Sequence, residues 1–423
     1  MHTCVVFLEN FMKVPLFDTL IKPIQKAFDC APDYSGIALF EMGGKHRMTW
    51  QGGYADNGRK TPHTLNTQYS IASLSKQFTA VALLMALAEK KLDLSTSLQG
   101  LLASYLPDYD TPWVNKITLH QLLTHTTGLD NYTDFAFRDK MKMINDGSDA
   151  HNQHLALIKT FTQNPAKVDR FNYSNTNYNL LALVIEKLTG KMVGDYMASV
   201  IFEPLRMNDT AYFCDSSNDI LKRESILPNV ALGYVLDSTK SEIEKSPCKI
   251  YENYGTSAGD GSIVSTASDL HKWCVDLFRE NKVIPKVISD LICRPHVSDP
   301  TLNENTVDWY GYGICRQDFK NLLLNNFGHN GLTYGYSSFM SYFPNLDAIY
   351  IQLSNFAENY FITSKIRETI RQEYSNLDES PGSEKIIINA LEKRYPGYGD
   401  RLKCIEPDVV TNLKKYLDLT APV

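Results

Sequence analysis

Ser73 and Lys76 are the residues whose types and spacing most directly suggest chemistry, and they lie in the segment SIASLSKQFTA. If a helix begins near Ser73, positions i and i+3 share a face, so the lysine amine can approach the serine hydroxyl. A serine hydroxyl is a weak nucleophile until a neighbouring group accepts its proton. Burial lowers the pKa of a lysine and so prepares it to accept that proton. The pair therefore predicts covalent catalysis with Ser73 as nucleophile and Lys76 as base.

The surroundings of this pair distinguish it from a chance match. A second Ser-x-x-Lys occurs at Ser246 and Lys249, where Pro247 and polar neighbours predict a surface loop. Residues 79–87 (TAVALLMAL), in contrast, are apolar on every side, which predicts a helix buried at the centre of the protein. A lysine at the start of such a helix is costly unless it has a function.

Tyr173 and Asn175 form a second motif, in the segment RFNYSNTNYNLL just ahead of a predicted helix. A tyrosine there could shuttle a proton between the nucleophile and the leaving group. An asparagine two residues later could hydrogen-bond a substrate amide. Tyr-x-Asn alone is a weak signal, so we expect a role for these residues only beside Ser73 and Lys76.

His329, Asn330 and Gly331 form the only His-x-Gly of the chain, ahead of a strand-like run at 336–343. A glycine at the start of a strand lets a substrate backbone come close. The next amide, that of Leu332, could then donate to the oxygen of a reacting carbonyl. In isolation, a histidine in a loop beside a turn glycine would be the better interpretation of this motif.

Other residues offer weaker possibilities. His151 and His154 have the spacing of a metal pair, but no Glu-x-x-His accompanies them, so a solvated helix face is the better interpretation. Tyr132, Phe135 and Phe137 could line a substrate cleft or pack in the core.

The elements that must position these residues follow from hydrophobic periodicity. Helical spacing at 17–28, 119–123, 155–161 and 179–188, with Gly190 as a C-cap, contrasts with strand-like runs at 36–40, 48–50, 261–264, 337–343 and 348–354. Sheet-forming segments at both ends with helices between them predict one α/β unit with a helical insertion. We expect a sheet domain from residues 1–75 and 255–377, a helical domain at 76–254, and an appended helical tail at 378–423.

Composition limits the function classes. A net charge of −6 without a basic run argues against nucleic acid as a partner. The eight scattered cysteines contain no C-x-x-C pair, which argues against a zinc site or a dense disulfide framework. The amino terminus has no basic region before its short apolar run, and no apolar stretch is long enough to span a bilayer. A cytoplasmic location is therefore the expectation.

Taken in order, these segments resemble the serine β-lactamase-like and penicillin-binding-protein family, which includes class C β-lactamases, D-alanyl-D-alanine carboxypeptidases, D-aminopeptidases and esterases. The resemblance runs from about residue 36 to 355 and includes ITLHQLLTHTTGL, FEPLRMNDTAY and GSIVSTASDLHKW. It implies an α+β sandwich, with an antiparallel sheet flanked by helices, and an active site between the sheet and the inserted helical domain. It gives His125, within LLTHTTGL, no catalytic role, and we expect a structural hydrogen-bonder there.

The resemblance also implies roles for the site residues. It makes Ser73 the acylated nucleophile, Lys76 its base, Tyr173 and Asn175 the second motif, His329 and Gly331 the third motif, and the amides of Ser73 and Leu332 the oxyanion hole. It implies no metal and no organic cofactor, and a small molecule or short peptide as substrate.

The third motif departs from the family pattern, in which β-lactamases carry Lys-Thr-Gly or a close variant. We expect His329 to be only partly protonated near neutral pH, and Asn330 replaces a hydroxyl residue. This favours esters and other amides over β-lactams. A transacylase on the same fold, and a scaffold or binding protein with incidental turnover, remain alternatives, and the oligomeric state is open.

Overall fold

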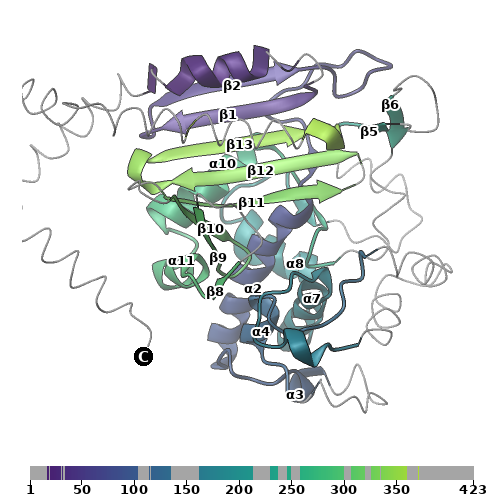
Figure 1. The fold of residues 1–423 in the computed structure, drawn as a ribbon, viewed down its shortest axis with the longest axis vertical. Coiled ribbons are helices and arrows are strands. Elements are labelled where there is room, and N and C mark those ends of the chain that lie inside the picture. The colour runs from purple at the N-terminus through teal and green to yellow at the C-terminus, as the bar shows by residue number, and fades with distance from the viewer. Residues whose placement is uncertain are drawn as a thin grey trace, which may run out of the picture. The chain divides into compact units, whose positions relative to one another are not determined.

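The computed structural model describes residues 17–18, 20–29, 31, 34–102, 114, 116–134, 162–212, 229–236, 245–248, 258–299, 306–319, 325–333, 335–359 and 370. The chain divides into two compact units, residues 1–369 and 370–423. The helices and strands named here belong to the first unit (Figure 1).

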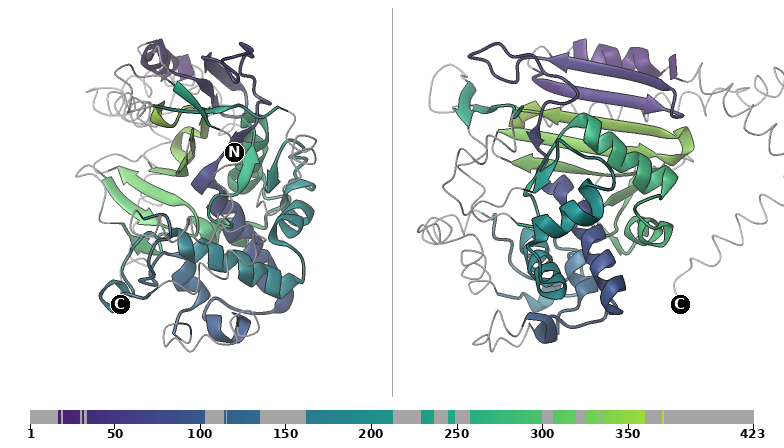
Figure 2. Two further views of the ribbon diagram at one scale, coloured as in Figure 1. Left: turned by 90° about the vertical axis from the view of Figure 1, so that its right-hand side faces the viewer. Right: turned by 180° about the vertical axis from the view of Figure 1, so that it is seen from behind.

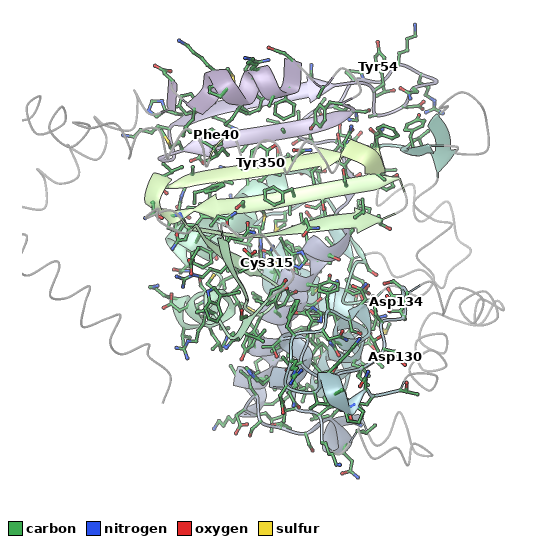
Figure 3. All side chains as sticks on the ribbon, viewed as in Figure 1. Phe40, Tyr54, Asp130, Asp134, Cys315 and Tyr350 are labelled. Atoms are coloured by element: carbon green, nitrogen blue, oxygen red, sulfur yellow. The ribbon has the colours of Figure 1, made fainter. Side chains whose placement is uncertain are left out.

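An eight-stranded antiparallel sheet dominates the described part of the first unit. Its order is β2-β1-β13-β12-β11-β10-β9-β8, so the hairpin β1-β2 is paired with β13, which is the last strand among the described residues. Phe40 and Tyr350 are register partners across that junction, and Figure 3 shows them on adjacent strands. The strands are β1 (Gly36–Met42), β2 (His46–Gly52), β8 (Val297–Ser298), β9 (Thr306–Tyr310), β10 (Cys315–Phe319), β11 (Asn325–Thr333), β12 (Tyr336–Phe343) and β13 (Ala348–Ser354).

Both faces of the sheet are covered at β1, which explains why all seven of its residues are buried. Successive side chains of a strand point to opposite faces. On one face, Phe40 lies 6.0 Å from Phe17 of the amino-terminal helix, between ring centroids. On the other face, Glu41 pairs with His271 of α10 (Ala267–Val275), and α10 lies in front of the sheet in the right-hand view of Figure 2, which is seen from behind.

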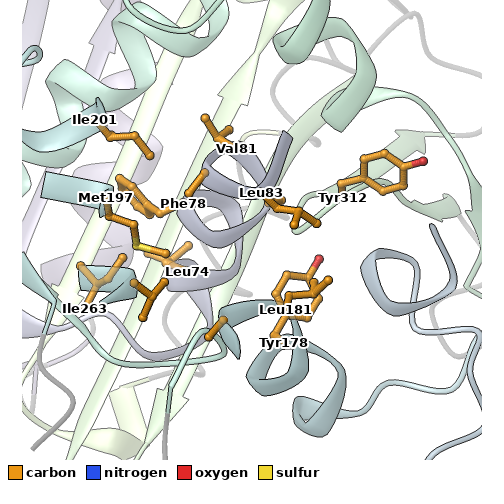
Figure 4. Packing of buried hydrophobic residues seen from close by; sticks show 14 of the residues in the cluster. Leu74, Phe78, Val81, Leu83, Tyr178, Leu181, Met197, Ile201, Ile263 and Tyr312 are labelled. Atoms are coloured by element: carbon orange, nitrogen blue, oxygen red, sulfur yellow. The ribbon is translucent and has the colours of Figure 1, made fainter. Parts of the chain in front are cut away.

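Helix α2 (Ser75–Lys90) occupies the centre of the hydrophobic core, as its apolar sequence predicts. It packs against α7 (Asn175–Thr189), and the rings of Phe78 and Trp273 stack with centroids 3.9 Å apart. Figure 4 shows Leu74, Phe78 and Val81 converging with residues of α7 and of the helices that follow it. Burial on every side anchors the start of α2, where the predicted nucleophile and base lie.

The remaining elements complete the helical layer and two small sheets, β3-β7-β4 and β5-β6. They are β3 (Tyr69–Ser70), η1 (Ala72–Leu74), α3 (Leu98–Leu102), α4 (Leu119–Leu123), η3 (Pro165–Lys167), α8 (Val193–Met197), η4 (Ala198–Phe202), β4 (Ala211–Tyr212), β5 (Gly233–Leu236), β6 (Lys245–Cys248), β7 (Ile263–Ser265), η6 (Asp276–Glu280), α11 (Lys286–Cys293), η7 (Pro344–Leu346) and η8 (Ala357–Asn359).

The predicted fold class, an antiparallel sheet flanked by helices, is confirmed. Two local predictions are wrong. Ser246 and Pro247 lie in strand β6 rather than in a loop, because they pair with β5. The His-x-Gly motif lies inside β11 rather than at the start of a strand, because pairing with β12 extends through it. The predicted helix at 155–161 lies outside the described residues, and the boundaries at 76–254 and 378–423 stay predictions.

Within the described residues, none of the helices has the length and apolar character needed to cross a membrane. Across those same ranges, no group of three or more His, Cys, Asp or Glu side chains is arranged to hold a metal ion.

Candidate active site

Ser73 stands on a strained turn at the head of α2. Its neighbour Ala72 has a left-handed φ of 46°, a conformation that costs a residue with a Cβ about 1–2 kcal/mol. Ala72 and Ser73 belong to the single turn η1, which joins β3 directly to α2. The turn therefore holds the hydroxyl of Ser73 between the sheet and the helical layer, where it is partly exposed.

Hydrogen bonds from two sheets hold this turn in place. Ile71 N–H donates to Ile263 O at 3.0 Å, and Ile263 N–H donates to Ser75 Oγ at 3.1 Å. On the other side, Ser338 Oγ of β12 donates to Ile71 O at 2.7 Å. These bonds are consistent with the strained φ of Ala72, because strained backbone persists only where surrounding structure over-determines it.

Gly331 lets strand β11 come close to the same turn. A Cβ at this position would lie 2.3 Å from Ile71 O and 2.4 Å from Ser338 Oγ. Only a residue without a side chain fits between β11 and the turn that carries Ser73. From the sequence we expected Gly331 to allow close approach of a substrate, whereas in the structure it allows close approach of the protein's own backbone at Ile71.

Lys76 is fully buried and has an oxygen acceptor for each of its three ammonium protons. Its Nζ donates to Ser73 Oγ at 3.0 Å, to Asn175 Oδ1 at 2.6 Å and to Asp260 O at 2.8 Å. Burial lowers the pKa of Lys76 to about 8, although the negative charge of Asp260 raises it in part. A small fraction of Lys76 is therefore neutral near pH 7, and most is neutral at pH 9.

Tyr173 approaches the same serine oxygen from the other side. Its O–H donates to Ser73 Oγ at 3.0 Å, and its ring centroid lies 5.1 Å from Lys76 Nζ. Burial raises the pKa of Tyr173 far above its ordinary range, and the hydrogen bond to Ser73 only partly offsets this. Tyr173 is therefore a phenol at any working pH, so it can donate a proton but is a poor base.

Asn175 is the first residue of α7, and its side chain is fixed at both ends. Its Oδ1 accepts from Lys76, and its Nδ2 donates to Thr133 Oγ1 at 3.1 Å. Its backbone N–H donates to Asn131 Oδ1 at 3.0 Å. The loop at 130–134 thus positions the second motif.

His329 lies on β11, close to the first two motifs, with its ring centroid 6.3 Å from that of Tyr173. Only 4% of the residue is exposed. Burial and then the charge of Lys76 lower its pKa to about 4, against a smaller upward effect of its bond to Asn330. The expectation that His329 is partly protonated near neutral pH is therefore wrong, because the ring is not solvated.

The other two residues predicted at the third motif occupy different environments. Asn330 is half-buried, and its carbonyl accepts from His329 Nδ1 at 2.5 Å. Leu332 follows Gly331 on β11, and 55% of its surface is exposed. The role of its amide in an oxyanion hole stays a prediction.

Two residues that sequence reasoning missed contribute to this site. Asp260 supplies the carbonyl that binds Lys76, and its own carboxylate accepts from Tyr132 O–H at 2.7 Å. Tyr310 bonds the ring of His329 at 3.2 Å. Asp260 directly precedes the recognisable segment GSIVSTASDLHKW, a signal that could have drawn attention to it, whereas nothing local marks Tyr310.

The structure also describes two of the residues that the sequence marked as weaker candidates, His125 and Tyr132. His125 is fully buried and hydrogen-bonded, as expected of a structural residue. Tyr132 is buried, so the core interpretation fits it better than a cleft. The remaining lesser candidates, His151, His154, Phe135 and Phe137, lie outside the described residues.

Comparison with known proteins agrees with this architecture. A family model described as Beta-lactamase matches residues 24–372. Penicillin-binding protein 4* of Bacillus subtilis (strain 168) is 30% identical over 381 residues, covering 86% of this chain and 79% of that protein. Protein flp of Staphylococcus aureus (strain N315) is 25% identical over 73% of this chain, which spans 57% of that protein's length.

Among solved structures, the D-amino acid amidase of Ochrobactrum anthropi SV3, complexed with L-phenylalanine amide, is similar with a TM-score of 0.67. The identity is 23%, and the match covers 84% of this chain and 99% of the amidase. That likeness supports the fold. The family match over most of the chain shows that this protein belongs to the β-lactamase family, as a serine hydrolase of the penicillin-binding-protein and β-lactamase type.

Proposed function

We propose that this protein hydrolyses esters or amides that lack a carboxylate through an acyl-enzyme on Ser73, with Lys76 as base and Tyr173 as proton donor. The observation that carries the proposal is the position of Ser73 Oγ, which accepts from both Lys76 Nζ and Tyr173 O–H at 3.0 Å. Lys76 has a lowered pKa and can accept a proton, whereas Tyr173 has a raised pKa and can donate one. Ser73 Oγ therefore contacts both the base and the acid that acyl transfer needs.

The first step is attack of Ser73 on the substrate carbonyl. Loss of one proton turns Lys76 Nζ into an acceptor, so the hydroxyl proton of Ser73 passes to it as Oγ bonds to the carbonyl carbon. The amides of Ser73 and Leu332 would donate to the resulting oxyanion. The site can hold a neutral Lys76 because burial lowers its pKa to about 8.

The second step is loss of the leaving group. Tyr173 is a buried phenol that points at the reacting oxygen. It would give its proton to the departing alkoxide or amine, and Lys76, now an ammonium, would return one proton to the tyrosine. Water would then cleave the acyl ester by the same route in reverse, with its proton taken by Lys76.

The proposed substrate class follows from the third motif. His329 is neutral near pH 7 because its pKa is lowered to about 4, so it offers a carboxylate no Coulombic attraction. L-phenylalanine amide, named for the similar amidase structure, has no carboxylate and is compatible with such a site. We therefore expect p-nitrophenyl esters and amino-acid amides to react faster than nitrocefin.

The decisive experiment is labelling by a fluorophosphonate in the wild type and in Ser73→Ala. We expect labelling and hydrolysis in the wild type and neither in Ser73→Ala, since removing the nucleophile of a serine hydrolase costs on the order of 10⁶ in rate. Ser246→Ala is the matched control, because Ser246 belongs to the other Ser-x-x-Lys and lies in β6. Turnover that persists in a folded Ser73→Ala protein would rule out the mechanism.

The two alternative functions give different results in the same assay. A transacylase would form a new ester or amide when an alcohol or amine acceptor is added. A scaffold or binding protein with incidental turnover would show no labelling that depends on Ser73, and its turnover would be the same in the wild type and in Ser73→Ala.

A further inference from the structure

A continuous path of buried hydrogen-bonding groups leads from the loop before α7 to the third motif. Ser174 N–H donates to His125 Nδ1 at 3.2 Å, and His125 Nε2 lies 3.2 Å from the hydroxyl of Tyr310. That hydroxyl lies 3.2 Å from His329 Nε2, and His329 Nδ1 lies 2.5 Å from Asn330 O. His125, Tyr310 and His329 are exposed by only 0%, 1% and 4%, so water does not compete for these bonds.

The first end of this path determines where His125 carries its proton. Its Nδ1 faces two donors, Ser174 N–H and Asn177 Nδ2 at 3.1 Å. The amide of Asn177 is oriented by Thr127, whose hydroxyl donates to Oδ1 at 2.7 Å. Nδ1 must therefore be the unprotonated nitrogen, and Nε2–H donates to Tyr310.

The other end determines the proton of His329. Its Nδ1 faces the carbonyl of Asn330, which can only accept, so Nδ1 carries the hydrogen. Its Nε2 must then accept, and the hydroxyl of Tyr310 is the donor within reach. The two ends agree: Tyr310 accepts from His125 and donates to His329, and every hydrogen bond along the path runs in one direction.

We propose that Tyr310 and His125 are positioning residues that hold His329 in its neutral Nδ1–H tautomer, so that the third motif presents no positive charge to the substrate. A second proton on His329 Nε2 would require the Tyr310 hydroxyl to turn its own proton away, and the hydrogen bond that Nε2 now accepts would be lost. The proposal deepens the proposed function, on which it rests, because it names two residues outside the three motifs that fix the tautomer of the third-motif imidazole, which burial and Lys76 keep uncharged.

The charged group nearest to His329 also favours the neutral form of its ring. Lys76 from α2 carries a positive charge and lowers the pKa of His329 directly. Among the described residues, the neighbours that act electrostatically on Tyr310 are Tyr178 and Tyr173 on the α7 side and Cys315 of β10, which is labelled in Figure 3. Tyr178 also hydrogen-bonds the Tyr310 side chain. Asp260 is the carboxylate next to Lys76, and it bonds to Tyr132 rather than to either imidazole.

The test is ¹⁵N NMR of the full chain labelled at its ten histidines, with His329 and His125 assigned from His329→Gln and His125→Gln. Long-range proton–nitrogen correlations distinguish the two neutral tautomers and the cation. At pH 7 we expect Nδ1–H for His329 and Nε2–H for His125. The opposite tautomer of His329, or a charged ring, would overturn the proposal, and both tautomers are read in the wild-type protein.

Tyr310→Phe then tests the connection. We expect His329 Nε2 to shift to the position of an unbonded imidazole nitrogen, while His125 keeps its tautomer because both donors to Nδ1 remain. The pH at which His329 becomes charged should rise by roughly 0.7 units, the effect of losing one neutral hydrogen bond, while the ring stays neutral at pH 7 because its pKa starts from about 4. Tyr312→Phe is the matched control, because it removes a hydroxyl bonded at 2.7 Å to His120 instead; it should change neither the His329 signals nor that pH.

Unchanged His329 signals in Tyr310→Phe would also overturn the proposal. Its failure is distinguishable from failure of the proposed function. If the wild type reacts with fluorophosphonate but His329 shows the other tautomer, only the proposed role of Tyr310 and His125 is refuted. If the wild type shows the expected tautomers but no labelling at Ser73, the proposed hydrolysis through Ser73 is refuted, and the proposed substrate preference is refuted with it.

Discussion

Substitution of Gly331 by alanine tests whether the contact between β11 and the nucleophile turn matters for catalysis. The added Cβ would lie 2.3 Å from Ile71 O, and real Cβ atoms essentially never approach closer than 3.0 Å. The hydroxyl of Ser338 can rotate away, but the carbonyl of Ile71 belongs to the backbone beside Ala72. Strand β11 and the turn must therefore separate by about 0.7 Å.

The size of this displacement sets the expected effect. A misplacement of about 1 Å can cost about 10²-fold in rate, so we expect kcat/KM to fall roughly 10- to 100-fold in Gly331→Ala. Overpacking of this kind costs about 1–3 kcal/mol of unfolding free energy, so the protein should still fold. The assay is kcat/KM for a p-nitrophenyl ester together with urea unfolding.

Gly100→Ala is the matched control, because a Cβ at Gly100 in α3 would meet nothing within 4 Å. It should leave kcat/KM unchanged. If Gly331→Ala retained kcat/KM within a factor of about two, the close approach of β11 would be irrelevant to the chemistry, and the reasoning from Ile71 would be refuted.

Three further predictions concern the base and the turn. We expect kcat/KM to rise as pH increases through about 8, because only neutral Lys76 can accept the serine proton; a flat profile from pH 6 to 10 would contradict this. Asp260→Asn removes a charge that raises the pKa of Lys76, so the midpoint of the same profile should move to lower pH, and an upward move would refute the assignment. Ala72→Val should lower the unfolding free energy by about 1–3 kcal/mol, since a β-branched residue is strained at a φ of 46°. Ala72→Gly should not lower it, which unfolding of both variants in urea would check.

The elements that were predicted correctly are those with strong local signals. Helix α2 is apolar on every side, α7 ends at Gly190 in a left-handed conformation, and β1 and β2 flank a glycine pair. Strand β11 was missed because its sequence, NNFGHNGLT, is rich in residues that avoid strands. It is a strand because β10 and β12 pair with it on either side, and that information is not local.

Residue types and spacing alone determined that Ser73 and Lys76 share one turn at the head of a buried helix, and that two further motifs could supply a phenol and an imidazole. The protonation states of Lys76 and His329, in contrast, depend on the tertiary structure. Lys76 meets Asn175 and the carbonyl of Asp260, 99 and 184 positions away in the chain. His329 is neutral because burial, Lys76 and the path through Tyr310 surround its ring. A pKa depends on desolvation and on neighbouring charges and hydrogen bonds, and folding brings those neighbours from segments that are distant in sequence.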